Sequence, residues 1–214
     1  MGIGDNLSDS FGYAQEALVG KWMRWIVLII STIIFPLIYG YTLRVMKGIN
    51  PAPEAENFLD LFIDGIKMIV ISFVYMIIPF IIFFASAGAA VIGLIGKNDS
   101  ISLGMLGAAA GGMLIFIIVA FIFGLFATIG MIRFARTDSM GEAFNISEIM
   151  AIIARIGWLN YILALIVLWI VLCVIQVILS VIPIIGWVIL FIISPFLAIV
   201  SSRYFSNLYD LGTV

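Results

Sequence analysis

Five long stretches of the chain contain no aspartate, glutamate, lysine or arginine, and this feature limits the possible folds most strongly. They cover residues 25–43, 68–96, 100–132, 156–180 and 181–202. A helix needs about 20 mostly apolar residues to cross ~30 Å of hydrocarbon. Backbone groups in lipid must be satisfied within the chain, and no stretch alternates as barrel strands do. The sequence therefore predicts an all-α, polytopic integral membrane helical bundle that forms a single transmembrane domain over residues 1–214.

The composition excludes several classes of protein. Hydrophobic residues make up 64% of the 214 residues and charged residues 10%, whereas a soluble domain has about 45–50% apolar and about 25% charged residues. Too few polar residues remain to cover the surface of a soluble enzyme. The net charge of −2 provides no basic surface for a phosphate backbone. Nucleic acid is therefore not an expected partner.

The expected spans are residues 25–43, 68–96, 101–132, 157–180 and 183–202, the last beginning at Pro183 because proline is tolerated in the first turn of a helix. Residues 25–43 barely reach the required length and contain Pro36. One tilted helix is the simpler prediction, and a re-entrant pair of half-helices is the alternative.

Five spans divide the ten basic residues seven to three across the membrane, whereas four spans plus a re-entrant hairpin divide them nine to one. Basic residues collect on the cytoplasmic side, so both arrangements predict a multi-pass protein of the cell membrane with a cytoplasmic C-terminus.

Three polar segments are expected to form amphipathic interfacial helices, at about residues 10–22, 57–67 and 141–155. In the second and third of these, apolar residues recur every three to four positions opposite a polar face, which is the pattern of a helix lying on a surface. Each of these two segments runs directly into an expected span. The alternative is therefore that each is a plain extension of that span.

Several short motifs occur in a recognisable order. They are residues 40–44 (Gly-Tyr-Thr-Leu-Arg), 51–54 (Pro-Ala-Pro-Glu), 61–67 (Leu-Phe-Ile-Asp-Gly-Ile-Lys) and 75–79, followed by 142–144 (Glu-Ala-Phe) and 157–161 (Gly-Trp-Leu-Asn-Tyr). In this order the chain resembles a prokaryotic, largely archaeal, membrane-protein family catalogued as domain of unknown function 4013. Residues 51–54 depart from the family, which more often has a Leu-Pro pair before the acidic residue. The resemblance implies a polytopic membrane protein without an assigned activity, and it supplies no catalytic residues.

Small residues indicate where two spans approach each other closely. The candidate helix-packing residues are Ala89, Gly93, Gly104, Gly107 and Gly111. Small side chains let the backbones of membrane helices come close and gain van der Waals contacts. We expect these residues to pack the second span against the third, because the two strips lie on either side of one polar turn. Self-association of two subunits is the alternative.

Few polar side chains occur within the expected spans, and none of them is aspartate, glutamate, lysine, arginine or histidine. Gln176, Ser72 and Ser194 are the candidate solute-lining residues, although Gln176 is expected to form a hydrogen bond with a neighbouring helix. Ionisable residues inside a membrane usually mark ion or proton paths, so ion-coupled transport is not predicted. The chain has no histidine and a single cysteine, Cys173. No catalytic residue, metal site or cofactor is therefore predicted.

These features predict a non-enzymatic polytopic membrane protein that organises membrane components or partner subunits. The expected partners are membrane lipids and either a second copy of the chain or other membrane subunits. A permease or channel for a small uncharged or apolar solute is the alternative function, since prolines within the apolar stretches can break helices near a binding site.

Overall fold

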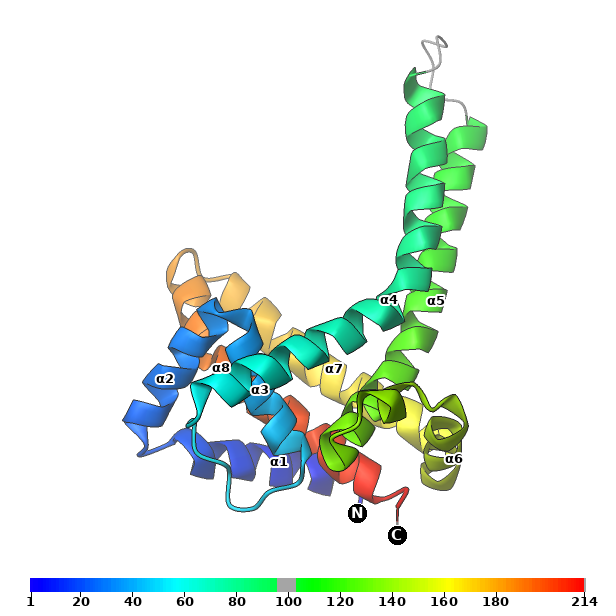
Figure 1. The fold of residues 1–214 in the computed structure, drawn as a ribbon. Helices are drawn as coiled ribbons and strands as arrows, with labels where there is room; N and C mark the ends of the chain where they lie inside the picture. Colours follow the sequence, from blue (N-terminus) through cyan, green and yellow to red (C-terminus); the bar gives the residue numbers. More distant parts are fainter. Residues whose placement is uncertain (96–102, 214) are drawn as a thin grey trace. The chain divides into compact units, whose positions relative to one another are not determined.

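The computed structural model describes residues 1–95 and 103–213, and this part of the chain is helical with no strand. It divides into two compact units, whose helices are labelled in Figure 1. Unit 1 comprises Met1–Ile69 and Thr128–Val214, and unit 2 comprises Val70–Ala127. Four helical segments are long and apolar enough to cross a membrane, namely Phe58–Gly88, Ala110–Thr137, Trp158–Ser180 and Ile185–Asp210. The prediction of an all-α polytopic membrane protein is confirmed.

The first helix, α1 (Ile3–Leu18), differs from the expected surface helix at residues 10–22. It begins seven residues earlier and ends four residues earlier, because the chain turns at Gly20, whose φ of 79° is readily adopted only by glycine. The apolar residues Ala14, Ala17 and Leu18 are completely buried. Helix α1 is thus packed into the core of unit 1.

The single helix predicted over residues 25–43 is wrong. The chain instead forms α2 (Trp22–Ile33) and α3 (Phe35–Met46), with a break at Ile34. Pro36 lies in the first turn of α3, where its lack of an N–H is harmless, but the same residue cannot continue the hydrogen bonding of α2. Each helix has 12 residues, or about 18 Å at 1.5 Å per residue, which is too short to cross a bilayer.

The two ends of the α2–α3 hairpin lie together. Arg24, in the first turn of α2, donates from Nε to the carboxylate of Glu54 at 3.0 Å, and Glu54 follows α3 in the chain. The same guanidinium donates from Nη1 to the carbonyl oxygen of Ala17 in α1 at 3.2 Å. The chain therefore enters and leaves the hairpin on one side, as in the re-entrant alternative.

Helix α4 (Phe58–Ile95) includes the polar segment at residues 57–67, which is therefore an extension of the span and not a separate surface helix. Two glycines let its N-terminal part cross α3 at very short range within unit 1. A Cβ at Gly40 would overlap the carbonyl oxygen of Leu61, and a Cβ at Gly65 would overlap that of Pro36. Each helix thus places a glycine against the backbone of the other.

Unit 2 consists of the C-terminal part of α4 and the N-terminal part of α5 (Leu103–Thr137), which pack against each other. The rings of Phe83 and Phe116 lie 5.2 Å apart, and a Cβ at Gly112 would overlap the side chain of Ser86.

The helix-packing residues predicted for this hairpin can be followed only in part. A Cβ at Gly107 or Gly111 would meet no described atom within 4 Å. The side chains of residues 89–106, and with them Ala89, Gly93 and Gly104, lie outside the described ones. The described close approach is made instead by Gly112, because one residue turns the helix by about 100° and brings a different face toward α4.

The predicted surface helix at residues 141–155 corresponds to two elements. They are a 3-10 helix, η1 (Met140–Phe144), and α6 (Ile146–Ile156), whose first turn is capped by Asn145 through its side-chain oxygen and the Glu148 amide at 3.3 Å. Gly157, with a φ of 89°, separates α6 from α7 (Trp158–Ser180). Helix α6 is therefore a separate helix that buries Ile149, Ile152 and Ile153, and not an extension of the span.

The last helix, α8 (Ile185–Asp210), extends eight residues beyond the predicted end at residue 202. The prediction ended there because Arg203 interrupts the apolar sequence. In the structure this polar end of the helix is not exposed: Ser202, Ser206 and Asn207 are buried. The elements that bury them form the contact network described next.

Candidate functional site

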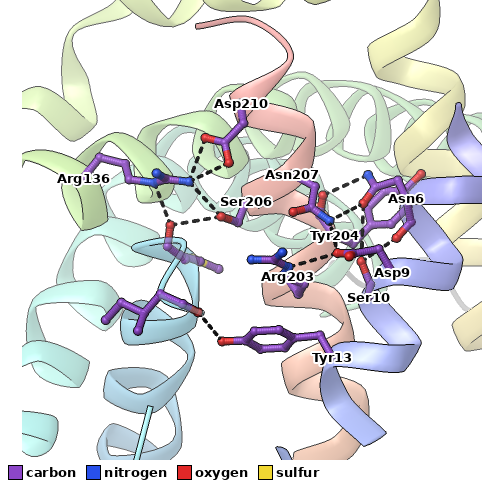
Figure 2. A network of polar contacts seen from close by, with 12 residues as sticks. Asn6, Asp9, Ser10, Tyr13, Arg136, Arg203, Tyr204, Ser206, Asn207 and Asp210 are labelled. Carbon is purple, nitrogen blue, oxygen red and sulfur yellow. Dashed lines mark hydrogen bonds and ion pairs between the residues drawn. The ribbon is translucent and has the colours of Figure 1, made fainter. Parts of the chain in front are cut away.

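The polar end of α8 and the helix α1 carry polar residues at the same spacing. On α1 these are Asn6, Asp9, Ser10 and Tyr13, and on α8 they are Arg203, Ser206, Asn207 and Asp210. Offsets of 0, 3, 4 and 7 place each set on one face of its helix. The two polar faces meet in Figure 2, where side chains of both helices are joined by hydrogen bonds.

Asn207 lies at the centre of the contact between α1 and α8. Its Nδ2 donates to Oδ1 of Asn6 at 2.9 Å and to Oδ2 of Asp9 at 2.7 Å. Oδ2 of Asp9 also accepts from Nε of Arg203 at 3.1 Å, and Nδ2 of Asn6 donates to the carbonyl oxygen of Tyr204 at 3.2 Å. These bonds fix the N-terminal helix on the C-terminal end of α8.

A second group of bonds ties α8 to α5 and to the end of α3. Nη2 of Arg136 binds both carboxylate oxygens of Asp210, at 2.8 and 3.0 Å, and Oγ of Ser206 at 2.9 Å. Nε of Arg136 donates to the carbonyl oxygen of Met46 at 3.0 Å. Figure 2 shows the Arg136 guanidinium joined to Asp210 and Ser206 by dashed lines. One guanidinium thus joins three helices of unit 1.

The sequence analysis missed this network, although the sequence carries a signal for it. The matching spacing of polar residues in two distant helices, one of them at the end of an apolar stretch, could have paired the two faces. The network fixes helix positions, since its charged members are satisfied by one another. Among the described residues no group of three or more histidine, cysteine, aspartate or glutamate side chains is arranged to hold a metal ion.

Among the described residues outside the spans and the α2–α3 hairpin, Tyr13 and Glu142 have shifted pKa values. Burial raises the pKa of Tyr13 to about 12, and the Arg203 guanidinium, 4.7 Å from the ring centre, opposes part of that rise. The hydrogen bond from Arg133 lowers the pKa of Glu142. Both shifts have a local structural cause, and neither group lines one of the pockets described for the placed residues.

The clearest candidate binding surface is a groove between the C-terminal part of α7 and the N-terminal half of α8, here called the α7–α8 groove. Its volume is about 660 Å³, and it is lined by Gln176, Val177, Ser180, Trp187, Leu190, Phe191, Ser194 and Leu197. The structure therefore brings together Gln176 and Ser194, two of the three candidate solute-lining residues. The third, Ser72, belongs to unit 2 and does not line the groove.

The polar groups in the α7–α8 groove differ in whether they have partners. Oγ of Ser180 donates to the carbonyl oxygen of Val177, and Oγ of Ser194 to that of Phe191, each at 2.8 Å. The amide of Gln176 is exposed and forms no hydrogen bond with the described residues. The expected bond to a neighbouring helix of the same chain is thus not formed within the described part. In hydrocarbon an unpaired polar group costs several kcal/mol, so a partner from outside the described chain would stabilise this amide there.

Comparison with known proteins identifies one family. The family described as "Protein of unknown function (DUF4013)" matches residues 25–184. No curated protein and no solved structure matches the chain significantly. The match covers α2 to α7 and includes the two glycines of the α3–α4 crossing, which lie in the motifs at residues 40–44 and 61–67.

Proposed function

Because the chain belongs to the DUF4013 family, to which no activity is assigned, we propose a function from the α7–α8 groove. The protein is a non-enzymatic membrane protein that organises subunits in the plane of the bilayer. It does so by docking the α7–α8 groove against the same groove of a second copy. The single observation that carries the proposal is the exposed Gln176 amide, which has no hydrogen-bond partner in the described chain.

The chemistry of the amide favours a second copy as the partner. A glutamine side chain has an N–H₂ donor and a carbonyl acceptor, so two Gln176 side chains facing each other can exchange two hydrogen bonds. A two-fold interface brings the same patch of both subunits together. The second copy therefore supplies the required donor and acceptor without any further protein.

The surface around Gln176 suits contact between helices. Ser180 and Ser194 are small, which allows a close approach of backbones, and Val177 is 62% exposed. Only 11% of the most apolar part of α7 is buried inside the chain. Most of this helix must therefore be covered by lipid or by another protein.

The other parts of the proposal rest on the sequence. With no histidine, the chain lacks the side chain that most often carries protons near neutral pH and binds metals, which supports a non-enzymatic role. The excess of basic residues on one side of the predicted topology supports a cell-membrane location with the C-terminus in the cytoplasm.

A substitution at Gln176 tests the proposed dimer. Hydrogen bonds between membrane helices contribute about 1–2 kcal/mol in model peptides. Gln176→Leu is therefore expected to raise the dissociation constant of the dimer in lipid vesicles roughly tenfold, as measured by energy transfer between labelled copies. Gln176→Asn, which keeps the amide, is expected to retain most of the association. A wild-type protein that is monomeric in vesicles contradicts the proposal.

Cross-linking tests the position of the interface. In a Cys173→Ser background, Val177→Cys lies in the groove and Ile178→Cys lies outside it, although the native side chains are equally exposed at 62% and 60%. Oxidation is expected to give a disulfide-linked dimer with the first variant and little with the second. Equal cross-linking of both variants contradicts the assignment of the groove.

A second function, transport of a small uncharged solute, is favoured by one observation. Gln176 and Ser194 line the same groove, and both have groups able to bind a hydroxylated solute. Glycerol entry into vesicles containing the protein tests this function. Faster entry than into empty vesicles that is lost in Gln176→Leu supports transport, and equal rates with and without the protein exclude it for this solute.

A further inference from the structure

A second hollow lies where α2 begins, beside the loop that follows α3, and is here called the α2 cleft. Its volume is about 460 Å³, and it is lined by Lys21, Met23, Arg24, Val27, Glu54, Ala55 and Glu56. All of these residues belong to unit 1. The lining combines charges of both signs with three apolar side chains, those of Met23, Val27 and Ala55.

The charges of the α2 cleft are only partly neutralised by one another. Arg24 is bound to Glu54, and only 5% of its side chain is exposed. Lys21 and Glu56 are exposed, and their side chains form no ion pair or hydrogen bond with the described residues. One ammonium and one carboxylate thus remain available, and the cleft has both a positive and a negative group without a net charge.

The apolar lining continues along the outer face of α2. Met23 is 75% exposed, and Ile26 and Ile30 follow it on the same helix, each at 53%. Next to the cleft, Trp22 stacks on Trp25 with ring centres 5.8 Å apart. Tryptophan collects at the depth of lipid headgroups. The polar end of the cleft is thus expected at headgroup depth, with an apolar surface leading from it into the hydrocarbon.

We propose that the α2 cleft binds a membrane lipid with a phosphoethanolamine headgroup. Lys21 binds the phosphate, Glu56 binds the primary ammonium, and the lipid chains lie along Met23, Ile26 and Ile30. An anionic headgroup would meet the uncompensated carboxylate of Glu56, and a choline headgroup has no N–H to donate to it. The cleft therefore selects the headgroup that carries both a phosphate and an N–H donor. This inference is independent of the proposed dimer.

Native mass spectrometry of the purified full chain tests the inference. The protein is mixed in detergent with equal amounts of dioleoyl-phosphatidylethanolamine, -phosphatidylcholine and -phosphatidylglycerol, and the bound lipids are counted. The phosphatidylethanolamine adduct is expected to exceed each of the others at least fivefold, because only its headgroup brings a phosphate for Lys21 together with an N–H donor for Glu56. Equal binding of the three lipids, or preference for phosphatidylglycerol, overturns the proposal.

Single substitutions test which residue binds the ammonium end of the headgroup and which binds the phosphate end. Glu56→Gln is expected to remove the preference over phosphatidylcholine, because it weakens the contact with the ammonium group. Lys21→Gln is expected to lower the binding of both lipids, because it removes the contact with the phosphate. Glu16→Gln is the matched control, since Glu16 is exposed on α1 and does not line the cleft. Unchanged selectivity in Glu56→Gln, unchanged lipid binding in Lys21→Gln, or an equal loss in the control contradicts the proposed site.

Discussion

The hydroxyl of Tyr13 donates a hydrogen bond of 2.8 Å to the carbonyl oxygen of Ile49, 36 residues further along the chain. Tyr13 precedes the α2–α3 hairpin and Ile49 follows it, so the two ends of the hairpin meet at this bond (Figure 2). The bonds from Asn207 to Asn6 and Asp9 bring the C-terminal end of α8 to the same place. The N-terminus, the loop after α3 and the C-terminus therefore lie on one side of unit 1.

The first prediction concerns this arrangement in the membrane. In a Cys173→Ser background, Glu16→Cys and Asn50→Cys are expected to react with a membrane-impermeant maleimide from the same side. The reason is that α2 and α3 are too short to carry the chain across a bilayer of ~30 Å. Labelling of intact cells and of inverted vesicles distinguishes the two sides. Val181→Cys, in the turn between α7 and α8, is the comparison site and is not expected to react from that side. Labelling of Glu16→Cys and Asn50→Cys from opposite sides would mean that the segment between them crosses the membrane once, and would contradict the re-entrant arrangement.

The second prediction concerns the glycines at the α3–α4 crossing. Gly40→Ala and Gly65→Ala are each expected to lower the free energy of unfolding by about 1–3 kcal/mol or more, the range for overpacking, because the new methyl group meets backbone atoms that cannot move aside. Thermal unfolding in detergent measures the effect. Gly12→Ala is the matched control, since a Cβ there meets nothing within 4 Å. The control is expected to be neutral or stabilising, because alanine favours a helix over glycine by up to about 1 kcal/mol.

Helix boundaries could be predicted from the sequence where neighbouring residues signal them. The predicted start of α7 at residue 157 lies within one residue of its observed start, because Arg155 is the last charged residue before the apolar stretch. The break between α2 and α3 was predicted only as the alternative, because an apolar run of this length also fits one short span, which is the simpler reading. That choice depends on contacts such as Tyr13–Ile49, between residues far apart in the sequence. Gln176 and Ser194 could be chosen as candidates because polar residues are rare in the spans, whereas the α2 cleft depends on a loop that only the fold brings beside Lys21.

The third prediction compares substitutions at two adjacent glycines of α5. Gly112→Val is expected to destabilise the helical hairpin of unit 2, because its side chain would overlap that of Ser86. Gly111→Val is expected to have a much smaller effect, because a Cβ there meets no described atom within 4 Å. Thermal unfolding in detergent compares the two directly, since they differ only by one position. An equal loss of stability in both variants would mean that the contact face is not the one described.

The fourth prediction concerns the attachment of α1 to α8. Asn207→Leu keeps a side chain of similar size but removes two hydrogen bonds, leaving the buried Asn6 without one of its partners. An unsatisfied buried group costs about 1–3 kcal/mol, so α1 is expected to detach more readily. Hydrogen exchange of the amides of α1 is expected to accelerate more than that of α6. Ser201→Ala is the control, because Oγ of Ser201 bonds only to the backbone of its own helix, at the carbonyl oxygen of Leu197. Unchanged hydrogen exchange of the α1 amides in Asn207→Leu would mean that apolar contacts alone hold α1 on α8.

The fifth prediction concerns the pH dependence of the contact between Arg133 and Glu142. The hydrogen bond from Arg133 lowers the pKa of Glu142 below its ordinary value of 4.5. A lowered pKa in the folded state means that the folded protein holds this proton less tightly than the unfolded chain does. The contact therefore stabilises the fold above about pH 4.5, and this stabilisation is lost as the pH falls through the lowered pKa.

The melting temperature of Glu142→Gln is expected to lie below that of the wild type at pH 7, and the difference is expected to narrow progressively below pH 4.5. Glu16→Gln serves as the control, since Glu16 forms no ion pair with the described residues. A difference between Glu142→Gln and the wild type that stays constant down to pH 3 would show that the substitution acts through packing and not through the charge.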